Sequence, residues 1–195
     1  MPVLSIPEPV WSLLLDAFAS APAGHERVAY LDGVRFRSDN GDLRAVATTV
    51  TVPDAVTSPG NYRVTAAAME RAGAHFDSLS LVRLAQVHTH GNRNVTHSWV
   101  DDQHAYSQMD GALSLVLPRH AAHRPSPRDA GVHVREAAGW RRVSQPEISQ
   151  VLRLVPSLID LRSGNPLWNG SPVDTKATSR DASLRSRMLA RLPWR

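Results

Sequence analysis

The sequence predicts an α/β fold, with helices packed beside a mixed and mostly antiparallel sheet. Three segments carry apolar residues at helical spacing, and several others are rich in β-branched or alternating apolar residues. The turn sequence Asp39-Asn40-Gly41-Asp42 separates two of these strand segments and therefore predicts a hairpin. At 195 residues the chain is long enough to bury a substantial core.

The first half is expected to contain a helix over 7–20, strands over 27–37 and 43–52, a loop over 53–60 and a helix over 62–76. The first helix has one apolar face, made of Trp11, Leu14, Leu15 and Phe18. Gly33 marks a bulge in the first of the two strands. The run of alanine, valine and threonine after Leu43 predicts its partner strand.

The second half is expected to contain a buried strand within 81–90, a short helix that begins at Ser98, a strand over 112–117, a loop over 119–130, a hairpin over 131–143 and a helix over 146–161. Ser98 and Asp101 have the spacing of a helix capping box. The last helix rests on an apolar stripe of residues between 148 and 159. We expect one domain over 1–162, followed by a basic C-terminal extension over 163–195 that includes a helix over 184–192.

The composition excludes several kinds of chemistry. The chain has no cysteine, which excludes disulfides, cysteine-ligated zinc, iron–sulfur clusters and a thiol nucleophile. Its net charge of +4 comes from residues 146–195, which hold 8 basic and 4 acidic residues. This density is too low to favour a nucleic-acid partner, so we expect a solvated extension or one that binds a partner protein. Without a long apolar run or a secretory signal, we expect no membrane partner and a cytoplasmic location.

The nine histidines are therefore the first candidates for catalysis, and two of them form an informative motif. Residues two apart on a strand point to the same face, so His88 and His90 converge at the end of a strand. After seven intervening residues Ser98 begins a helix, and Asp101 follows three positions further on. Two imidazoles and one carboxylate are a zinc ligand set with an open fourth position, which is typical of a catalytic site.

This spacing of His88, His90, Ser98 and Asp101 resembles the JAMM (MPN-plus) zinc metalloprotease family, as do the flanking elements over about residues 5–160. The resemblance implies an MPN (JAB) domain, a cytidine-deaminase-like mixed sheet flanked by helices. It implies one catalytic Zn²⁺ held by His88, His90 and Asp101. It also implies Glu26 as the proton-transfer group and Ser98 as a residue that stabilises the oxyanion.

The implied activity is hydrolysis of an isopeptide or peptide bond at the C-terminus of ubiquitin or a ubiquitin-like protein, in deconjugation or precursor processing. A bacterial ubiquitin-like or antiviral defence operon is one setting for such an enzyme. The compact chain resembles prokaryotic-type members. Two departures stand out: Gly91 occupies the position where the family commonly has proline, and Val28-Ala29-Tyr30 replaces the usual glycine-rich continuation after Glu26.

Two other functions remain open, a non-catalytic MPN scaffold and a JAMM hydrolase of small molecules or short peptides. Several residues near the motif also have ordinary interpretations. We expect His97 and His104 to be solvated or to support the ligands, and Asp102 to be a neighbour of the ligand Asp101 rather than a ligand. His120 and His123 are expected on the surface. The tryptophans are expected in packing: Trp99, Trp140 and Trp168.

Overall fold

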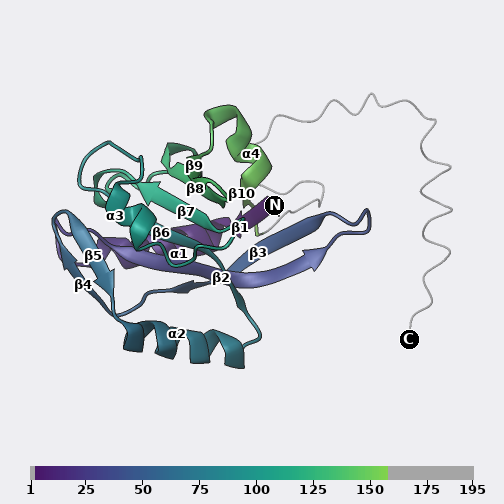
Figure 1. The fold of residues 1–195 in the computed structure, drawn as a ribbon, viewed down its shortest axis with the longest axis horizontal. Coiled ribbons are helices and arrows are strands. Elements are labelled where there is room, and N and C mark those ends of the chain that lie inside the picture. The colour runs from purple at the N-terminus through teal and green to yellow at the C-terminus, as the bar shows by residue number, and fades with distance from the viewer. Residues whose placement is uncertain (1–2, 158–195) are drawn as a thin grey trace, which may run out of the picture. The chain divides into compact units, whose positions relative to one another are not determined.

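The computed structural model describes residues 3–157, and the strands in that range form one eight-stranded mixed sheet and a separate two-stranded one (Figure 1). The large sheet has the order β10-β1-β3-β2-β6-β7-β8-β9. Its strands are β1 (Val3–Pro7), β2 (Val28–Arg37), β3 (Leu43–Thr51), β6 (Val82–Thr89), β7 (Leu113–Leu117), β8 (Gly131–Glu136), β9 (Gly139–Arg142) and β10 (Leu152–Val155). The pairs β1–β10, β1–β3 and β6–β7 are parallel, and the other pairs are antiparallel. The expected α/β class is thereby confirmed.

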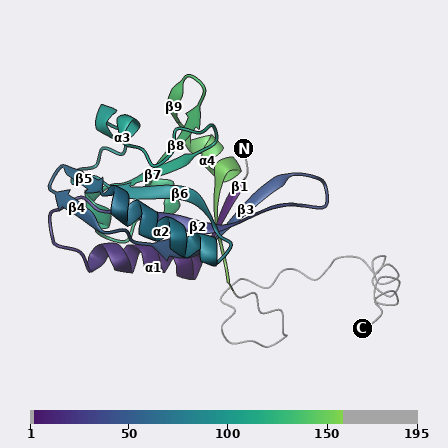
Figure 2. The same cartoon turned by 60° about the horizontal axis from the view of Figure 1, so that its bottom comes forward.

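The smaller elements complete the described part of the chain. They are the strands β4 (Ala55–Ser58) and β5 (Asn61–Val64), the helices α1 (Glu8–Ala19), α2 (Ala66–Ser78), α3 (Trp99–Gln103) and α4 (Ile148–Val151), and short 3₁₀ turns at Arg119–Ala121, Pro127–Asp129 and Gln145–Glu147. Figure 2 shows α1 and α2 as the two long helices beside the sheet, whereas α3 lies near the β7–β8 end.

One face of the sheet carries the apolar core, because side chains alternate between the faces of each strand. The predicted apolar face of α1 is buried there, against alternate residues of the central strands: Ala29, Leu31, Ala85, Val87, Leu113, Leu115, Leu117, Val132 and Val134. The opposite face is more polar. On it the strand register places Tyr30, Gln86, Ser114 and His133 in one row across β2, β6, β7 and β8. The candidate site lies on this second face.

Most predicted elements are confirmed, including the bulge beside Gly33, where the register of β2 and β3 shifts. The expected loop over 53–60 is wrong, because Ala55–Ser58 pairs with Asn61–Val64 around a Pro59-Gly60 turn. The helix expected over 62–76 consequently begins later, at Ala66. Thr65 caps it by accepting a hydrogen bond from the Ala68 backbone N–H at 3.2 Å.

The helix expected over 146–161 is wrong from Leu152 to the last described residue, and its end at 158–161 lies outside the described residues. Helix α4 ends at Val151, and β10 then pairs in parallel with β1, placing Leu152 opposite Leu4. The apolar residues of this segment pair with the edge of β1 instead of forming a helix, and no local sequence pattern indicates that pairing. Pro156 adds to the effect because it disfavours helical backbone at the preceding residue.

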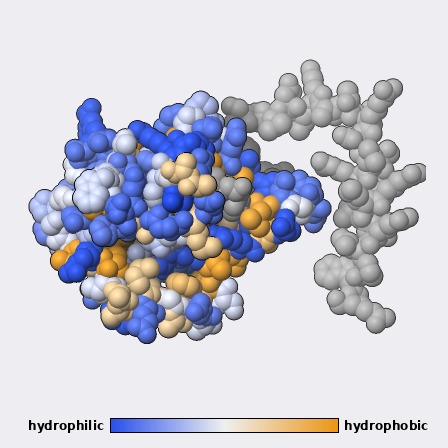
Figure 3. Space-filling view, in the orientation of Figure 1, coloured by the Kyte–Doolittle hydropathy of each residue, from blue (hydrophilic) through white to orange (hydrophobic). Residues whose placement is uncertain are grey.

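Several expectations lie outside the described residues: the domain end at 162, the basic extension over 163–195, the helix over 184–192 and Trp168. No helix within residues 3–157 is both long and apolar enough to cross a membrane. The face drawn in Figure 3 is mainly hydrophilic and carries separate apolar groups. Exposed apolar residues of β2 and β3 include Val34, Phe36 and Leu43.

Candidate metal centre

The C-terminal end of β6 positions the two histidines. His88 and His90 alternate with Thr89 and therefore point to the same polar side of the sheet. After a loop, α3 begins with Ser98 as its N-cap and returns Asp101 to this point as the third residue of the helix. The local sequence thus accounts for both halves of the site.

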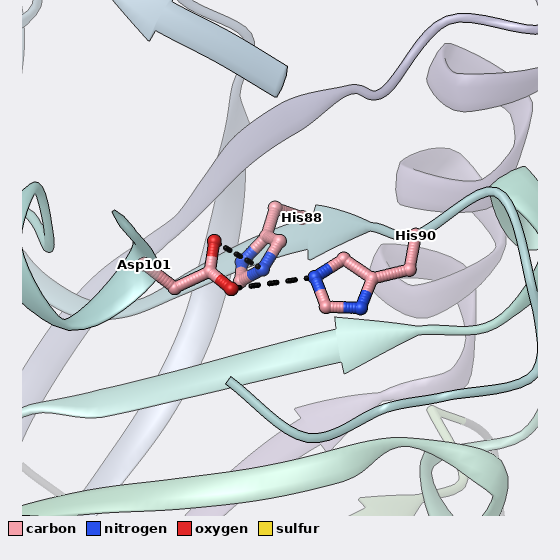
Figure 4. Close-up of side chains that lie close together, drawn as sticks. All are labelled: His88, His90 and Asp101. Atoms are coloured by element: carbon pink, nitrogen blue, oxygen red, sulfur yellow. Dashed lines mark ion pairs between the residues drawn. The ribbon is translucent and has the colours of Figure 1, made fainter. Parts of the chain in front are cut away.

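The three predicted metal ligands lie together (Figure 4). Nε2 of His88 is 3.3 Å from Oδ1 of Asp101, and Nε2 of His90 is 3.4 Å from Oδ2. One donor atom of each residue lies within 4.8 Å of the others. Two donors that each lie about 2.0–2.1 Å from a tetrahedral zinc ion are roughly 3.3 Å apart, so these spacings fit zinc.

The hydrogen bonds of the imidazoles also fit a cation. His90 Nδ1 is 2.9 Å from the carbonyl oxygen of Asn94, which makes Nδ1 the donor and leaves Nε2 with a free lone pair. Both ring nitrogens of His88 are buried, and neither makes a hydrogen bond to the described residues. A buried imidazole nitrogen without a partner is costly, and a cation beside Nε2 would satisfy it.

The electrostatics favour the ligand charge state at His88 and Asp101. At His90 burial would lower the pKa, but the bonds to Asp101 and Asn94 raise it. Burial lowers the pKa of His88 and keeps its imidazole neutral. Burial alone would raise the pKa of Asp101, but the adjacent His88 and His90 side chains and Ser98 hold it well below its usual range. The site therefore presents a carboxylate and at least one neutral imidazole, both of which are competent ligands.

Glu26 lies beside these residues because the β2–β6 ladder extends past its last regular pair. Val28 is opposite His88. The Thr89 backbone N–H then donates to the Arg27 carbonyl oxygen, and the Arg27 backbone N–H donates to the Thr89 hydroxyl, both at 3.0 Å. Before this point the chain turns to the β4–β5 hairpin, where the Glu26 backbone N–H donates to the Ser58 carbonyl oxygen at 2.8 Å. Glu26 and His90 then face the same space. Both residues line one cleft of about 540 Å³ together with Ser98 and Asp101. Burial raises the pKa of Glu26 to about 7, which suits proton exchange near neutral pH.

Ser98 makes its contacts to Asp101. Its hydroxyl donates to Asp101 Oδ2 at 2.8 Å, its backbone N–H donates to the same oxygen at 2.6 Å, and its Oγ accepts from the Asp101 backbone N–H at 3.2 Å. This is the expected capping box, with aspartate in place of glutamate. In this arrangement Ser98 orients the carboxylate, and its role toward an oxyanion stays a prediction.

A buried polar network behind the site was only partly foreseen. His97 Nδ1 is 2.8 Å from Asp102 Oδ1, and its Nε2 is 2.9 Å from Ser114 Oγ. Its ring stacks on that of His133 with centroids 3.8 Å apart. Polar residues at alternate positions of β7 and β8 were a signal for such a network, but only the strand order shows that Ser114 and His133 face His97.

Glycines allow the loop before α3 to approach the sheet. A Cβ on Gly131 would lie 1.8 Å from the carbonyl oxygen of Val95, so the loop backbone passes directly over β8 there. Gly91, which replaces the family's proline, similarly packs against the His120 ring, 2.9 Å from the position a Cβ would take. Both contacts anchor the segment that joins His90 to Asp101.

The expectation that Trp99 is a packing residue is wrong, because this first residue of α3 is 72% exposed and lines the cleft. Trp140 does pack, with its ring edge-on to His97 at 5.2 Å between centroids. His104 and His123 are exposed, and His120 is partly buried beside Gly91.

No family model matches the sequence, and no curated protein matches it. Several solved structures are similar. A protein from Desulfitobacterium hafniense has a TM-score of 0.58 and 16% identity over 80% of this chain and 95% of that chain, which shows a shared fold. A protein from Salinibacter ruber has a TM-score of 0.49 and 15% identity over 82% and 95% of the two chains. A JAB1/MPN domain protein from Archaeoglobus fulgidus has a TM-score of 0.43 and 15% identity over 78% and 98%.

Proposed function

We propose that this protein is a zinc-dependent isopeptidase or peptidase that hydrolyses bonds at the C-terminus of ubiquitin or a ubiquitin-like protein. The observation that carries the proposal is the convergence of His88, His90 and Asp101 at spacings that suit tetrahedral zinc. The match of these residues and Ser98 to the JAMM spacing supports it independently.

Three protein ligands leave one coordination position open, as in catalytic rather than structural zinc sites. When bound, zinc would polarise a carbonyl group and make a water molecule more acidic. The cleft of about 540 Å³ beside the ligands provides room for a peptide bond.

Glu26 is the proposed proton-transfer group. Its carboxylate takes a proton from the attacking water as the new C–O bond forms, and returns it to the nitrogen as the C–N bond breaks. Ser98 holds the Asp101 carboxylate by two hydrogen bonds and keeps it aimed at the histidines. Glu26 is mostly buried and lines the same cleft as the ligands, so it can exchange a proton with a group bound there.

An extended tail is the kind of substrate that suits the cleft. The turn of the β4–β5 hairpin contributes Pro59, Gly60 and Asn61 to one wall. Neither strand of this hairpin forms a ladder with another described strand. The Ser58 carbonyl oxygen of β4 accepts from the Glu26 backbone N–H, so β5 is the edge that offers backbone groups to an extended chain. We propose that the substrate tail binds in this way.

Two measurements test the proposal. Protein freed of metal by chelator should bind one equivalent of zinc in calorimetry, whereas His88→Ala and Asp101→Ala should not, and His75→Ala on the exposed face of α2 is the matched control. Zinc-loaded protein should release the C-terminal partner from a ubiquitin fusion, and chelator should stop it. Glu26→Gln should retain zinc and lose hydrolysis. Less than about half an equivalent of zinc, or hydrolysis that survives chelation, would contradict the proposal.

A further inference from the structure

A second cavity opens beside the candidate metal centre. It has a volume of about 340 Å³, and its lining includes Tyr30, Tyr62, Val64, Met69, Ala105 and Tyr106. Asn61 and Val100 line both this cavity and the metal-site cleft, so the two spaces adjoin. A group bound in the cleft between β5 and α3 can therefore extend into the cavity.

Strand β6 connects the floor of the cavity to the ligands. Gln86, His88 and His90 alternate along the same face, so the cavity begins one residue pair before the first metal ligand. The Tyr62 ring lines the cavity, and its centroid is 5.3 Å from that of His88. The cavity is thus adjacent to the first candidate metal ligand.

The buried polar side chains of the cavity bond to one another or to the backbone. Gln86 Nε2 donates to the Tyr62 hydroxyl, and Gln86 Oε1 accepts from the Tyr106 backbone N–H at 3.1 Å. The Tyr30 hydroxyl donates to the Met69 sulfur at 3.2 Å. The exposed Asn61, Arg63 and His104 complete the lining. The rest of the surface left for a ligand is aromatic and aliphatic. Such a wall favours an uncharged, apolar group.

We propose that this cavity, hereafter the tyrosine pocket, binds the apolar side chain of a substrate residue next to the scissile bond, of the size of leucine, methionine or phenylalanine. The inference rests on the proposed function and narrows its substrate class. Its volume is at the low end for ligand pockets, which suits one side chain rather than a folded segment. Burying such a side chain should make binding about 10- to 100-fold tighter than for glycine at the same position.

Methionine-methyl NMR tests the pocket without relying on catalysis. The chain has 4 methionines; Met69 lines the tyrosine pocket, while Met109 is 78% exposed and lines a different cavity. The probes are four acetylated tripeptide amides, with leucine, phenylalanine, glycine or aspartate between two glycines. The leucine and phenylalanine peptides should shift the Met69 signal saturably, at least about tenfold more tightly than the glycine and aspartate peptides, and leave Met109 unchanged. No preference for leucine and phenylalanine, or no response of Met69, overturns the inference.

Two variants link the response to the pocket. Ala105→Leu should fill it and abolish the shift of Met69, whereas Ala67→Leu, on the exposed side of α2, should leave the shift intact. Hydrolysis separates this inference from the proposed function. If the peptides bind but zinc does not, the pocket stands and the proposed function fails. If zinc-loaded protein hydrolyses bonds flanked by glycine as fast as bonds flanked by leucine, the proposed function stands and the pocket inference fails.

Discussion

The Ser98 hydroxyl donates a 2.8 Å hydrogen bond to Asp101 Oδ2, the same oxygen that lies 3.4 Å from His90 Nε2. One short polar side chain therefore both caps α3 and aims a candidate ligand. The chain repeats this capping box far from the site, where Ser126 bonds to Asp129 Oδ2 with the same 2.8 Å distance. Comparing the two capping boxes therefore separates the effect of helix capping from the effect of orienting a metal ligand.

Replacing either serine should cost similar stability but different amounts of metal affinity. Ser98→Ala and Ser126→Ala should each lower the free energy of unfolding by about 0.5–2 kcal/mol, measured in urea, because each loses an N-cap. Only Ser98→Ala should also weaken zinc binding, by about 10- to 100-fold in calorimetry, because Asp101 loses its orienting donor. Equal zinc affinities for the two variants would show that Ser98 is a cap alone.

Removing the His97 ring nitrogens should destabilise the domain. His97→Phe keeps the stacked ring but leaves Ser114, which is fully buried, without its partner, and breaks the contact to Asp102. We expect a loss of about 1–3 kcal/mol in the free energy of unfolding. The exposed His75→Phe should change it by less than about 0.5 kcal/mol. A loss no larger than that of His75→Phe would mean that the network adds little stability.

Adding one methyl group at Gly131 should displace the loop before α3. The new Cβ would overlap the Val95 carbonyl oxygen, which is backbone and has little freedom to yield. Gly131→Ala should therefore lower both the melting temperature and zinc affinity. Gly73→Ala is the matched control, because its Cβ meets nothing nearer than 4.0 Å and alanine favours the helix. Wild-type zinc affinity in Gly131→Ala would contradict the proposed anchoring of the loop.

The buried Arg83–Asp32 ion pair should contribute far more than an exposed one. Asp32 is fully buried, accepts from Arg83 Nε at 3.1 Å and accepts from the Thr51 hydroxyl. Asp32→Ala should cost about 3–5 kcal/mol in urea unfolding, because the Arg83 charge stays buried without a partner. Asp42→Ala, which breaks the solvent-exposed pair with Arg44, should cost no more than about 1 kcal/mol. Similar costs for the two variants would argue against this view of the pair.

The pH dependence of stability should report on His133. Burial and the neighbouring His97 lower its pKa from 6.5 to about 3, so the folded state keeps His133 neutral while the unfolded chain binds a proton below pH 6.5. The unfolded state then binds more protons, and stability falls as pH decreases from 6.5 toward 3, by at most about 1.4 kcal/mol per pH unit from this group. His133→Gln should flatten the urea-unfolding profile between pH 6.5 and 4.5. A profile of unchanged slope would mean that His133 titrates alike in both states.

The sequence by itself determined the local features. The spacing of His88, His90, Ser98 and Asp101 identified the candidate ligands, because strand alternation and the first turn of a helix have fixed geometry. The spacing of apolar residues likewise predicted helix α1 and the central strands. Glu26 was found by its order along the chain and its likeness to a family pattern.

Only the tertiary structure decided which distant segments meet. Strand β10 formed where a helix was expected because β1 supplied a parallel partner, and no local pattern encodes that edge. The row of Tyr30, Gln86, Ser114 and His133, the His97 network and the tyrosine pocket all depend on strand order and register. The position of Glu26 in the same cleft as His90 has the same origin, since it depends on the β2–β6 pairing beside it and on its hydrogen bond to Ser58 of the β4–β5 hairpin.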